Sequence, residues 1–332
     1  MTIRDIANLA GTSTTTVSYY LNGKYEKMST QTRKTIENVI DKTGYVPSVQ
    51  ARLLSGKKTG VISVLILDNT NDWSGQLING IENTANANDY QTVLCNSNFQ
   101  PDREHLYVEK MLSLGTDGFI IQPTSQFKAI NNRISRAGKP VVFYDCNLFD
   151  FKTSWIKTNL YDGVYSAISE CIERGYEQFI LIAANFTGSV YRTRIERTQG
   201  FSDAVTAHNL EYRKLNISHS EPSMSELERW FKYKLNTSKR TLIFVSNQWA
   251  LSRVFQALKS QIHLIPDRVG LLGINNQDWA NLTSPSISTI IEPVREEGKL
   301  ACEMLIKKLK DNDVEPQQKV LRCTTRWLES TL

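Results

Sequence analysis

The chain has 332 residues, of which 40% are hydrophobic and 22% charged, and these are the proportions of a globular protein with two or three domains. All of the formal net charge of +5 lies in residues 1–60, where nine Lys and Arg outnumber four Asp and Glu. A basic segment joined to a neutral body is typical of a protein that binds a polyanion such as DNA.

The N-terminus carries no apolar signal segment, and no stretch approaches 18 uninterrupted apolar residues, so we expect a cytoplasmic protein without membrane contact. The five cysteines are scattered and form no CxxC pair, which argues against a disulfide framework and a zinc site. The four histidines fall in no metal-ligand spacing, and neither a GxSxG nor a P-loop motif is present. The sequence therefore predicts no enzyme, no metal and no cofactor.

The first 44 residues have the pattern of three short helices. Residues 3–10 are predicted to form a helix capped by Thr2, and residues 14–21 a second helix capped by Ser13. A third helix is expected from Ser29 to Gly44, where a glycine suits the left-handed conformation at a helix end. The first two helices and the turn between them predict a helix-turn-helix, whose second helix enters the DNA major groove.

From residue 60 onward, apolar runs alternate with segments of helical period. Unbroken β-branched runs separated by helices predict parallel sheets covered on both faces. The runs form two series, at residues 61–67, 92–95, 118–121 and 141–144 and then at 179–183, 242–245 and 269–273. Two series predict two doubly wound lobes with a cleft at the carboxyl ends of the strands. Residues 293–310 and 319–323 are expected to cross back between the lobes.

The predicted fold class is therefore α/β: a small all-α helix-turn-helix headpiece followed by a two-lobed body of two doubly wound parallel sheets. We expect the headpiece at residues 1–46, a hinge helix and linker at 47–59, and an effector-binding and dimerisation body at 60–332. Within the body, one lobe is expected at about 60–160 plus 292–320 and the other at about 161–291 plus 321–332.

At this point the chain resembles the LacI family of sugar-responsive transcription regulators over nearly its whole length. The motifs that carry the resemblance are TIRDIANLAGTSTTTVSYYLN (2–22), GYVPSVQARLLSGKKT (44–59), RTQGF (197–201), SNQWALSRVFQAL (246–258), VGLLGINN (269–276) and SPSISTI (284–290). YLNGKYEKMS (20–29) and RIERTQGF (194–201) look most like regulators of hexuronate and glycosaminoglycan use that respond to 2-keto-3-deoxygluconate. The body would then resemble periplasmic binding proteins.

The start of a recognition helix needs short polar side chains, which let the backbone approach the base edges. Thr14, Thr15 and Thr16 meet this need, and the resemblance assigns the base contacts chiefly to the first two. Tyr19 lies on the same face, where many relatives carry Arg or His. The cations expected to reach phosphates are Lys24, Arg33 and Lys34.

By resemblance, residues 48–55 fold as a hinge helix only on operator DNA. Two copies would then enter the minor groove and wedge Leu54 between base pairs, which kinks the duplex. Ser48 begins this segment, Ala51 is small enough for close approach, and Arg52 can bind a phosphate.

The resemblance also implies an effector site between the lobes. An aromatic residue, Trp73, would stack on the ligand, and Arg197 would hold its oxygens, with Arg194 one helical turn away. Asp145 is expected in the polar lining, whereas Glu196 is expected to point elsewhere into solvent. His219 and Trp249 are weaker candidates, since each is more often structural.

Two pairs of neighbouring residues depart from the family pattern. Asn247 and Gln248 stand where the family usually has Asn-Asp, and Ile274 and Asn275 stand where it has Tyr-Asp. The loss of two carboxylates beside arginine predicts a pocket of positive potential, which favours a sugar acid because Arg binds carboxylates bidentately.

The predicted function is a homodimeric transcription factor, most simply a repressor of carbohydrate catabolic genes that a sugar acid releases from a double-stranded operator. The alternatives are a regulator of the same family that responds to a neutral sugar, or one whose DNA binding depends on an effector or corepressor. A sugar-binding transport protein of similar fold would carry an export signal and lack the DNA-binding headpiece.

Overall fold

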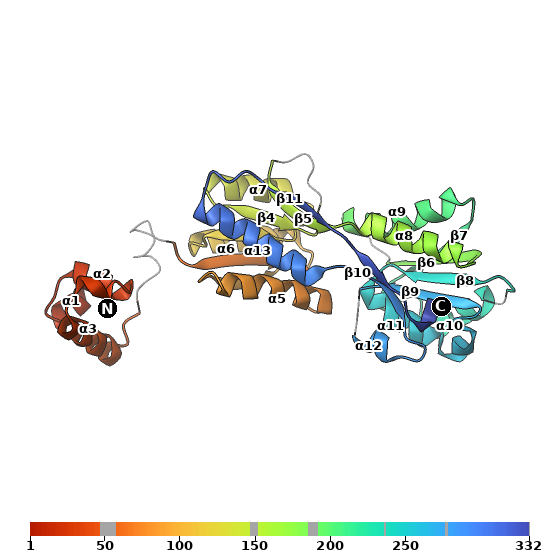
Figure 1. Cartoon of the computed structure of the whole chain (residues 1–332), viewed down its shortest axis with the longest axis horizontal. Helices are drawn as coiled ribbons and strands as arrows, with labels where there is room; N and C mark the ends of the chain where they lie inside the picture. Colours follow the sequence, from red (N-terminus) through yellow and green to blue (C-terminus); the bar gives the residue numbers. More distant parts are fainter. Residues whose placement is uncertain (47–57, 147–151, 185–191, 236, 276–277, 332) are drawn as a thin grey trace. The chain divides into compact units, whose positions relative to one another are not determined.

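The computed structural model describes residues 1–46, 58–146, 152–184, 192–235, 237–275 and 278–331. The chain divides into two compact units, Met1–Thr59 and Gly60–Leu332 (Figure 1). Among the described residues, no helix is both long enough and apolar enough to span a membrane.

The N-terminal unit is a three-helix domain. Its elements are α1 (Ile3–Leu9), α2 (Thr14–Leu21), the short 3-10 turn η1 (Tyr25–Lys27) and α3 (Thr30–Thr43). Ile6, Val17 and Ile36, one from each helix, are fully buried against one another and form the centre of the small core. The three helices predicted from the sequence are thus confirmed, and the predicted hinge helix at 48–55 lies outside the described residues.

The larger unit contains two six-stranded sheets, each with helices on both faces (Figure 1). The strand order of the first sheet is β11-β5-β4-β3-β1-β2, and all of its pairs are parallel. The second sheet has the order β12-β10-β9-β8-β6-β7, in which only the β10–β12 pair is antiparallel. The two doubly wound lobes predicted from the sequence are confirmed.

The first lobe is built mainly from the chain up to residue 158. Its elements are β1 (Val61–Ile66), α5 (Asp72–Asn86), β2 (Gln91–Asn96), α6 (Pro101–Ser113), β3 (Gly118–Ile121), α7 (Phe127–Arg136), β4 (Val141–Tyr144), β5 (Ser154–Thr158), α13 (Val294–Lys310) and β11 (Gln318–Leu321). Helices α5 and α13 cover one face of the sheet, and α6 and α7 cover the other.

The second lobe follows the same plan. Its elements are α8 (Leu160–Glu173), β6 (Gln178–Ala184), α9 (Arg192–Ala207), β7 (Tyr212–Ile217), α10 (Met224–Lys234), β8 (Thr241–Val245), α11 (Gln248–Ala257), η2 (Lys259–Leu264), β9 (Val269–Ile274), α12 (Asp278–Leu282), β10 (Ser288–Ile291), β12 (Thr324–Arg326) and η3 (Glu329–Thr331). Helices α8 and α9 pack on one face, and α10, α11 and α12 on the other. Strands β5, β7, β10, β11 and β12 were not predicted from the sequence.

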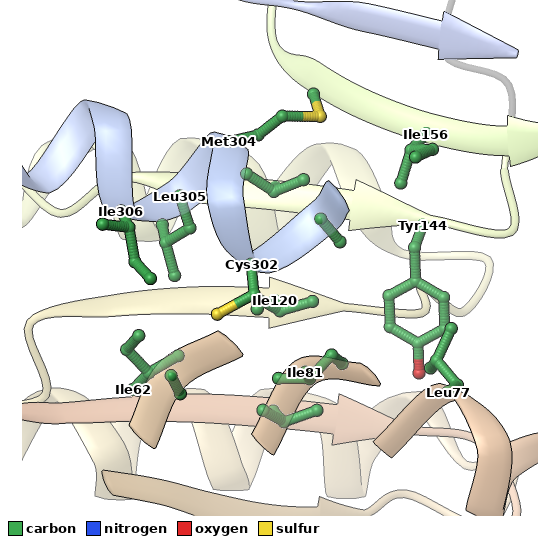
Figure 2. Close-up of a cluster of buried hydrophobic side chains, with 14 of the residues drawn as sticks. Ile62, Leu77, Ile81, Ile120, Tyr144, Ile156, Cys302, Met304, Leu305 and Ile306 are labelled. Carbon is green, nitrogen blue, oxygen red and sulfur yellow. The ribbon is translucent and has the colours of Figure 1, made fainter. Parts of the chain in front are cut away.

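The core of the first lobe brings distant parts of the chain together. Figure 2 shows Ile62, Ile120, Tyr144 and Ile156 from the strands, Leu77 and Ile81 from α5, and Cys302, Leu305 and Ile306 from α13. Helix α13 reaches this core only after the chain has built most of the second lobe. Its apolar face therefore fixes the return of the chain between the lobes, as the sequence predicted for residues 293–310.

Helices α5 and α13 cross at two glycines. A Cβ atom on Gly80 would lie 2.1 Å from the carbonyl oxygen of Arg295, and one on Gly298 would lie 2.2 Å from that of Leu77. These distances are far below van der Waals contact, so the two backbones approach this closely only because both positions lack a side chain.

This close approach predicts that Gly80→Ala destabilises the body. We expect a loss of about 1–3 kcal/mol in the free energy of unfolding, because the added methyl group forces the two backbones apart. Urea denaturation of the full chain measures the effect. The matched control is Gly75→Ala in the same helix, where a Cβ would meet nothing within 4 Å. Helix propensity should make that variant equal to wild type or slightly more stable. Equal stability of the two variants would contradict the packing described.

Candidate functional site

The headpiece presents the start of α2 to solvent. Ser13 caps this helix, since its side chain accepts a hydrogen bond from the backbone nitrogen of Thr16 and its Oγ lies 2.9 Å from the Thr16 hydroxyl. Thr14 and Thr15 are exposed, whereas Thr16 is half-buried. Of the three threonines predicted to face DNA, Thr16 therefore also serves the cap, and Thr14 and Thr15 have the more accessible side chains.

The other predicted DNA contacts in the headpiece have different surroundings. Tyr19 is half-buried and Lys24 is exposed. Arg33 is also exposed, and its guanidinium lies over the ring of Tyr25, 3.9 Å from the ring centroid. This cation–π contact holds the Arg33 side chain while its charge stays accessible to a phosphate. The predicted hinge contacts Ser48, Ala51, Arg52 and Leu54 lie outside the described residues.

The exposed threonines predict that Thr15→Ala lowers the affinity for the operator more than the affinity for random duplex. The change removes a hydroxyl and a methyl group that can meet base edges and leaves the charge of the headpiece unaltered. Loss of a base contact of this kind typically costs about 1–3 kcal/mol. Fluorescence anisotropy with both duplexes at one salt concentration measures the two affinities. Thr30→Ala, at an exposed position at the start of α3, is the control. An equal loss on both duplexes would show that Thr15 does not read sequence.

The body contains a cavity of about 350 Å³ lined by residues of both lobes. This volume lies within the range of small-molecule sites. The described lining residues are Leu67, Asp68, Thr70, Asn71, Trp73, Ser74, Phe99, Gln122, Pro123 and Asp145 from the first lobe, and Arg197, His219, Asn247, Gln248, Trp249 and Asn275 from the second. The structure thus brings together the predicted residues Trp73, Asp145, Arg197, Asn247, Gln248 and Asn275. Arg194 lies in α9, and its side chain is outside what the structure describes.

Most of these residues follow the carboxyl ends of strands. Asp68, Phe99 and Gln122 come after β1, β2 and β3, and Asp145 and Asn275 come directly after β4 and β9. Sequence analysis missed the first three, although their places after predicted strands are where a doubly wound fold gathers its binding residues. His219 and Trp249, the weaker candidates, also line the cavity, with ring centroids 4.2 Å apart.

The backbone is unusual at three lining positions. Phe99, Asp145 and Asn275 have positive φ angles of 58°, 49° and 65°. A left-handed conformation is costly for a residue with a side chain, and such strain is concentrated at functional sites. Asp145 and Asn275 occupy equivalent places in the two lobes, directly after β4 and β9, and both line the cavity.

Trp73 belongs both to the core and to the cavity. Its side chain is 8% exposed, and its ring is stacked with Tyr144 at a centroid distance of 6.3 Å. The indole nitrogen is buried without a hydrogen-bond partner among the described residues. The ring therefore offers an apolar wall to the cavity.

The Arg197 side chain reaches the cavity from α9, and its terminal nitrogens make only long hydrogen bonds to protein groups. One terminal nitrogen donates to the Ser246 carbonyl oxygen at 3.4 Å and the other to Glu292 at 3.3 Å. Both distances are at the long end for a hydrogen bond, and Nε has no partner among the described residues. The guanidinium can therefore donate to a bound ligand.

Two amides of the lining are already engaged with protein groups: Asn247, which keeps the residue type of the family pattern, and Asn275, which replaces a family carboxylate. The Asn247 Oδ1 atom accepts from the backbone nitrogen of Ala184 at 3.0 Å and from the Ser246 hydroxyl at 3.1 Å. The Asn275 side chain donates to Glu292 at 2.9 Å and accepts from the Glu292 backbone nitrogen at 3.2 Å. The structure therefore assigns both side chains a part in shaping the cavity wall.

The predicted positive potential is wrong for the described lining. Asp68 and Asp145 both line the cavity, and Arg197 is paired with the buried Glu292. Burial alone would raise the pKa of Asp68, but hydrogen bonds from Thr70 and Asn71 and the nearby His219 hold that pKa below its usual value. The prediction considered only the two positions where amides replace acids, and it left out Asp68 and the pairing of Arg197 with Glu292.

Glu196 also differs from its expected place in solvent. Its side chain forms an ion pair with Lys157, and the two side chains are 20% and 8% exposed. Because Lys157 lies on β5 and Glu196 on α9, this pair joins the two lobes beside the cavity.

The carboxyl of Glu297 is buried next to the backbone of Asp145. Glu297, in the first turn of α13, is fully buried and accepts a hydrogen bond from the backbone nitrogen of Asp145 at 3.1 Å. Burial and the nearby acids Asp145 and Glu292 raise the pKa of Glu297 well above its usual value. Its second oxygen has no partner among the described residues.

This environment predicts how Glu297→Gln changes stability with pH. The raised pKa means that the folded state binds the proton more tightly than the unfolded chain does. The contribution to stability is therefore full below the usual pKa of 4.5 and is lost as pH rises through the folded value. Glutamine mimics the protonated form, so the variant should gain stability over wild type as pH rises, measured by urea denaturation from pH 5 to 8. The neighbouring, exposed Glu296→Gln should show no such trend. Parallel pH profiles for E297Q and wild type would contradict this.

Comparisons with known proteins agree with both units. Residues 2–48 match the family model described as bacterial regulatory proteins, lacI family, and residues 168–331 match a periplasmic binding protein-like domain. The chain is 27% identical to the probable HTH-type transcriptional regulator EndR of Paenibacillus polymyxa, over 97% of this chain and 95% of that protein. It is 26% identical to the HTH-type transcriptional regulator KdgR of Bacillus subtilis (strain 168), over 95% and 93% of the two chains.

Among solved structures, the chain is similar to a periplasmic binding protein/LacI transcriptional regulator from Alkaliphilus metalliredigens QYMF, complexed with D-xylulofuranose. The TM-score is 0.69 at 24% identity, and the match covers 82% of this chain and all of that one. This likeness concerns the fold.

Proposed function

Because this chain belongs to the lacI family of bacterial regulatory proteins and is a DNA-binding transcriptional regulator, we propose that it is a repressor released from its operator by a small sugar acid. The proposed effector class includes 2-keto-3-deoxygluconate, and the proposed targets are genes for uronate or glycosaminoglycan catabolism. The regulator would act in the bacterial cytoplasm, where its DNA partner lies. The single observation that carries the effector proposal is a cavity lined from both lobes, with a loosely engaged arginine in its wall.

We propose a homodimer on a near-palindromic operator. One headpiece offers a single recognition helix with the exposed threonines Thr14 and Thr15. Two such helices on neighbouring half-sites require two-fold symmetry. The hinge residues Ser48, Ala51, Arg52 and Leu54 would add minor-groove contacts in each copy.

Two observations support an acidic effector. The two terminal nitrogens of Arg197 make only long contacts with protein groups, so a ligand carboxylate can accept hydrogen bonds from them in place of those contacts. The resemblance of residues 194–201 to regulators that respond to a keto-deoxy sugar acid supports the same class. Trp73 and Trp249 would provide apolar surface for the carbon skeleton of the sugar.

A neutral sugar is the second candidate, and the two lining carboxylates favour it. Asp68 and Asp145 can accept hydrogen bonds from sugar hydroxyls, and they oppose a further negative charge in the cavity. The similar structure from Alkaliphilus metalliredigens is complexed with a neutral sugar. Isothermal titration calorimetry of the full chain against 2-keto-3-deoxygluconate, D-glucuronate, D-glucose and D-xylulose distinguishes the two candidates. Binding of neutral sugars alone would overturn the sugar-acid proposal.

Release requires that the effector bind the DNA-incompetent state more tightly than the DNA-competent one. Because the cavity has a wall from each lobe, a ligand that contacts both walls favours one arrangement of the lobes over another. A coupling free energy of about 1–3 kcal/mol, which is typical of allosteric proteins, would weaken operator affinity about 5–150-fold.

The proposed role of Arg197 predicts that Arg197→Ala abolishes the response to the effector while operator binding persists. The guanidinium is part of the cavity wall, whereas the DNA contacts lie in the other compact unit. Gel retardation with a fragment upstream of the chain's own gene, titrated with effector, measures both properties. Arg213→Ala removes an exposed positive charge from β7 and serves as the control. Unchanged induction in R197A would remove the effector from this cavity.

A further inference from the structure

Three chain segments join the lobes, and hydrogen bonds connect them to one another. They lie between β5 and α8, between β10 and α13, and between β11 and β12. The backbone nitrogen of Asn159 donates to the Leu321 carbonyl oxygen at 2.8 Å, and the backbone nitrogen of Cys323 donates to the Asn159 side chain at 2.6 Å. The Thr158 hydroxyl donates to Glu292 at 2.7 Å. We call Thr158, Asn159, Glu292 and Cys323 the crossover cluster.

Glu292 is the charged member of the crossover cluster, and its side chain is 0% exposed. Its Oε1 atom accepts from the Asn275 amide at 2.9 Å and from Arg197 at 3.3 Å. Its Oε2 atom accepts from Thr158. A carboxylate that has lost water needs such donors, because an unpaired buried charge is very costly.

The donors to Glu292 belong to two functional surfaces. Arg197 and Asn275 line the cavity, whereas Thr158 belongs to the crossover cluster. The Glu292 carboxylate therefore contacts both the cavity wall and the chain segments that join the lobes. The contact with Arg197 is the longest of the three, so Glu292 keeps its two neutral donors when the guanidinium moves toward a ligand.

We propose that Glu292 is the positioning residue that sets the charge preference of the cavity and transmits effector binding to the crossover cluster. The negative charge of Glu292 neutralises Arg197 when no ligand is bound. The same charge repels the carboxylate of an acidic ligand that approaches Arg197. An acidic effector then binds by drawing Arg197 away from Glu292, whereas a neutral sugar leaves that pair in place. This inference rests on the proposed function, in that the cavity is taken as the effector site.

The first test is Glu292→Gln, which removes the charge and keeps the shape and an acceptor oxygen. We expect affinity for 2-keto-3-deoxygluconate or D-glucuronate to rise about tenfold or more, because removal of one negative charge a few ångströms away is worth at least that much. Affinity for D-glucose and D-xylulose should change less than about threefold. Calorimetry of the full chain measures the ratio of acid to neutral affinity, which a purely structural role would not alter.

The matched control is Glu104→Gln. Glu104 is also a buried carboxyl, but it accepts from the backbone nitrogen of Thr124 at 3.0 Å and from the Thr124 hydroxyl, and neither Glu104 nor Thr124 is among the residues that line the cavity. A general effect of replacing a buried acid would appear in both variants. A changed acid-to-neutral ratio in E292Q alone supports the inference.

The second test is Thr158→Val, which breaks the link to the crossover cluster and leaves the charges at the cavity unchanged. We expect effector affinity to stay within about threefold of wild type, while the effector-induced loss of operator affinity falls at least threefold.

If no sugar of either class binds wild type, the proposed effector site fails, and this inference fails with it. If sugars bind wild type and E292Q keeps the wild-type ratio, or T158V keeps full coupling, this inference alone is overturned.

Discussion

The rest of the body depends on the hydrogen bonds around one buried carboxylate. Each lobe has its own sheet and its own core, so nothing in their separate packing fixes how one lobe meets the other. Glu292 supplies a buried connection beside the three joining chain segments, since it accepts from Thr158 of the first lobe and from Asn275 and Arg197 of the second. The Lys157–Glu196 ion pair adds a second bond across the same boundary. Because two of these donors also form the cavity wall, the contacts that join the lobes are contacts that a ligand can disturb.

Because each lobe is close-packed, we expect the two lobes to move relative to each other at this boundary. Helices α5 and α13 interlock through Gly80 and Gly298, which leaves the first lobe little freedom to deform. Close-packed lobes move as units, so a change at the cavity appears as a change in the angle between them.

Much of this architecture could be predicted from the sequence, and the failures have physical causes. Runs such as residues 61–67 and 179–183 are buried on both faces and read clearly as strands. Strand β7 (YRKLNI) lies at a sheet edge with charged residues exposed, so its composition resembled a loop. Trp73 and Arg197 were located by resemblance, but Glu292 was not, because a single acid near a strand end gives no signal until the fold brings Asn275 and Arg197 to it. The positive potential predicted for the cavity was wrong for the described lining for the same reason.

We propose that a small sugar bound in the body controls how tightly the headpiece holds a particular operator. The most direct measurement is the affinity of the full chain for a fragment upstream of its own gene and for random duplex of equal length, with and without the sugars that bind in calorimetry. We expect a clear preference for the upstream fragment, and we expect the affinity for that fragment to fall about 5–150-fold when the effector is added. Equal affinity for both duplexes, or a preference that no sugar alters, would contradict it.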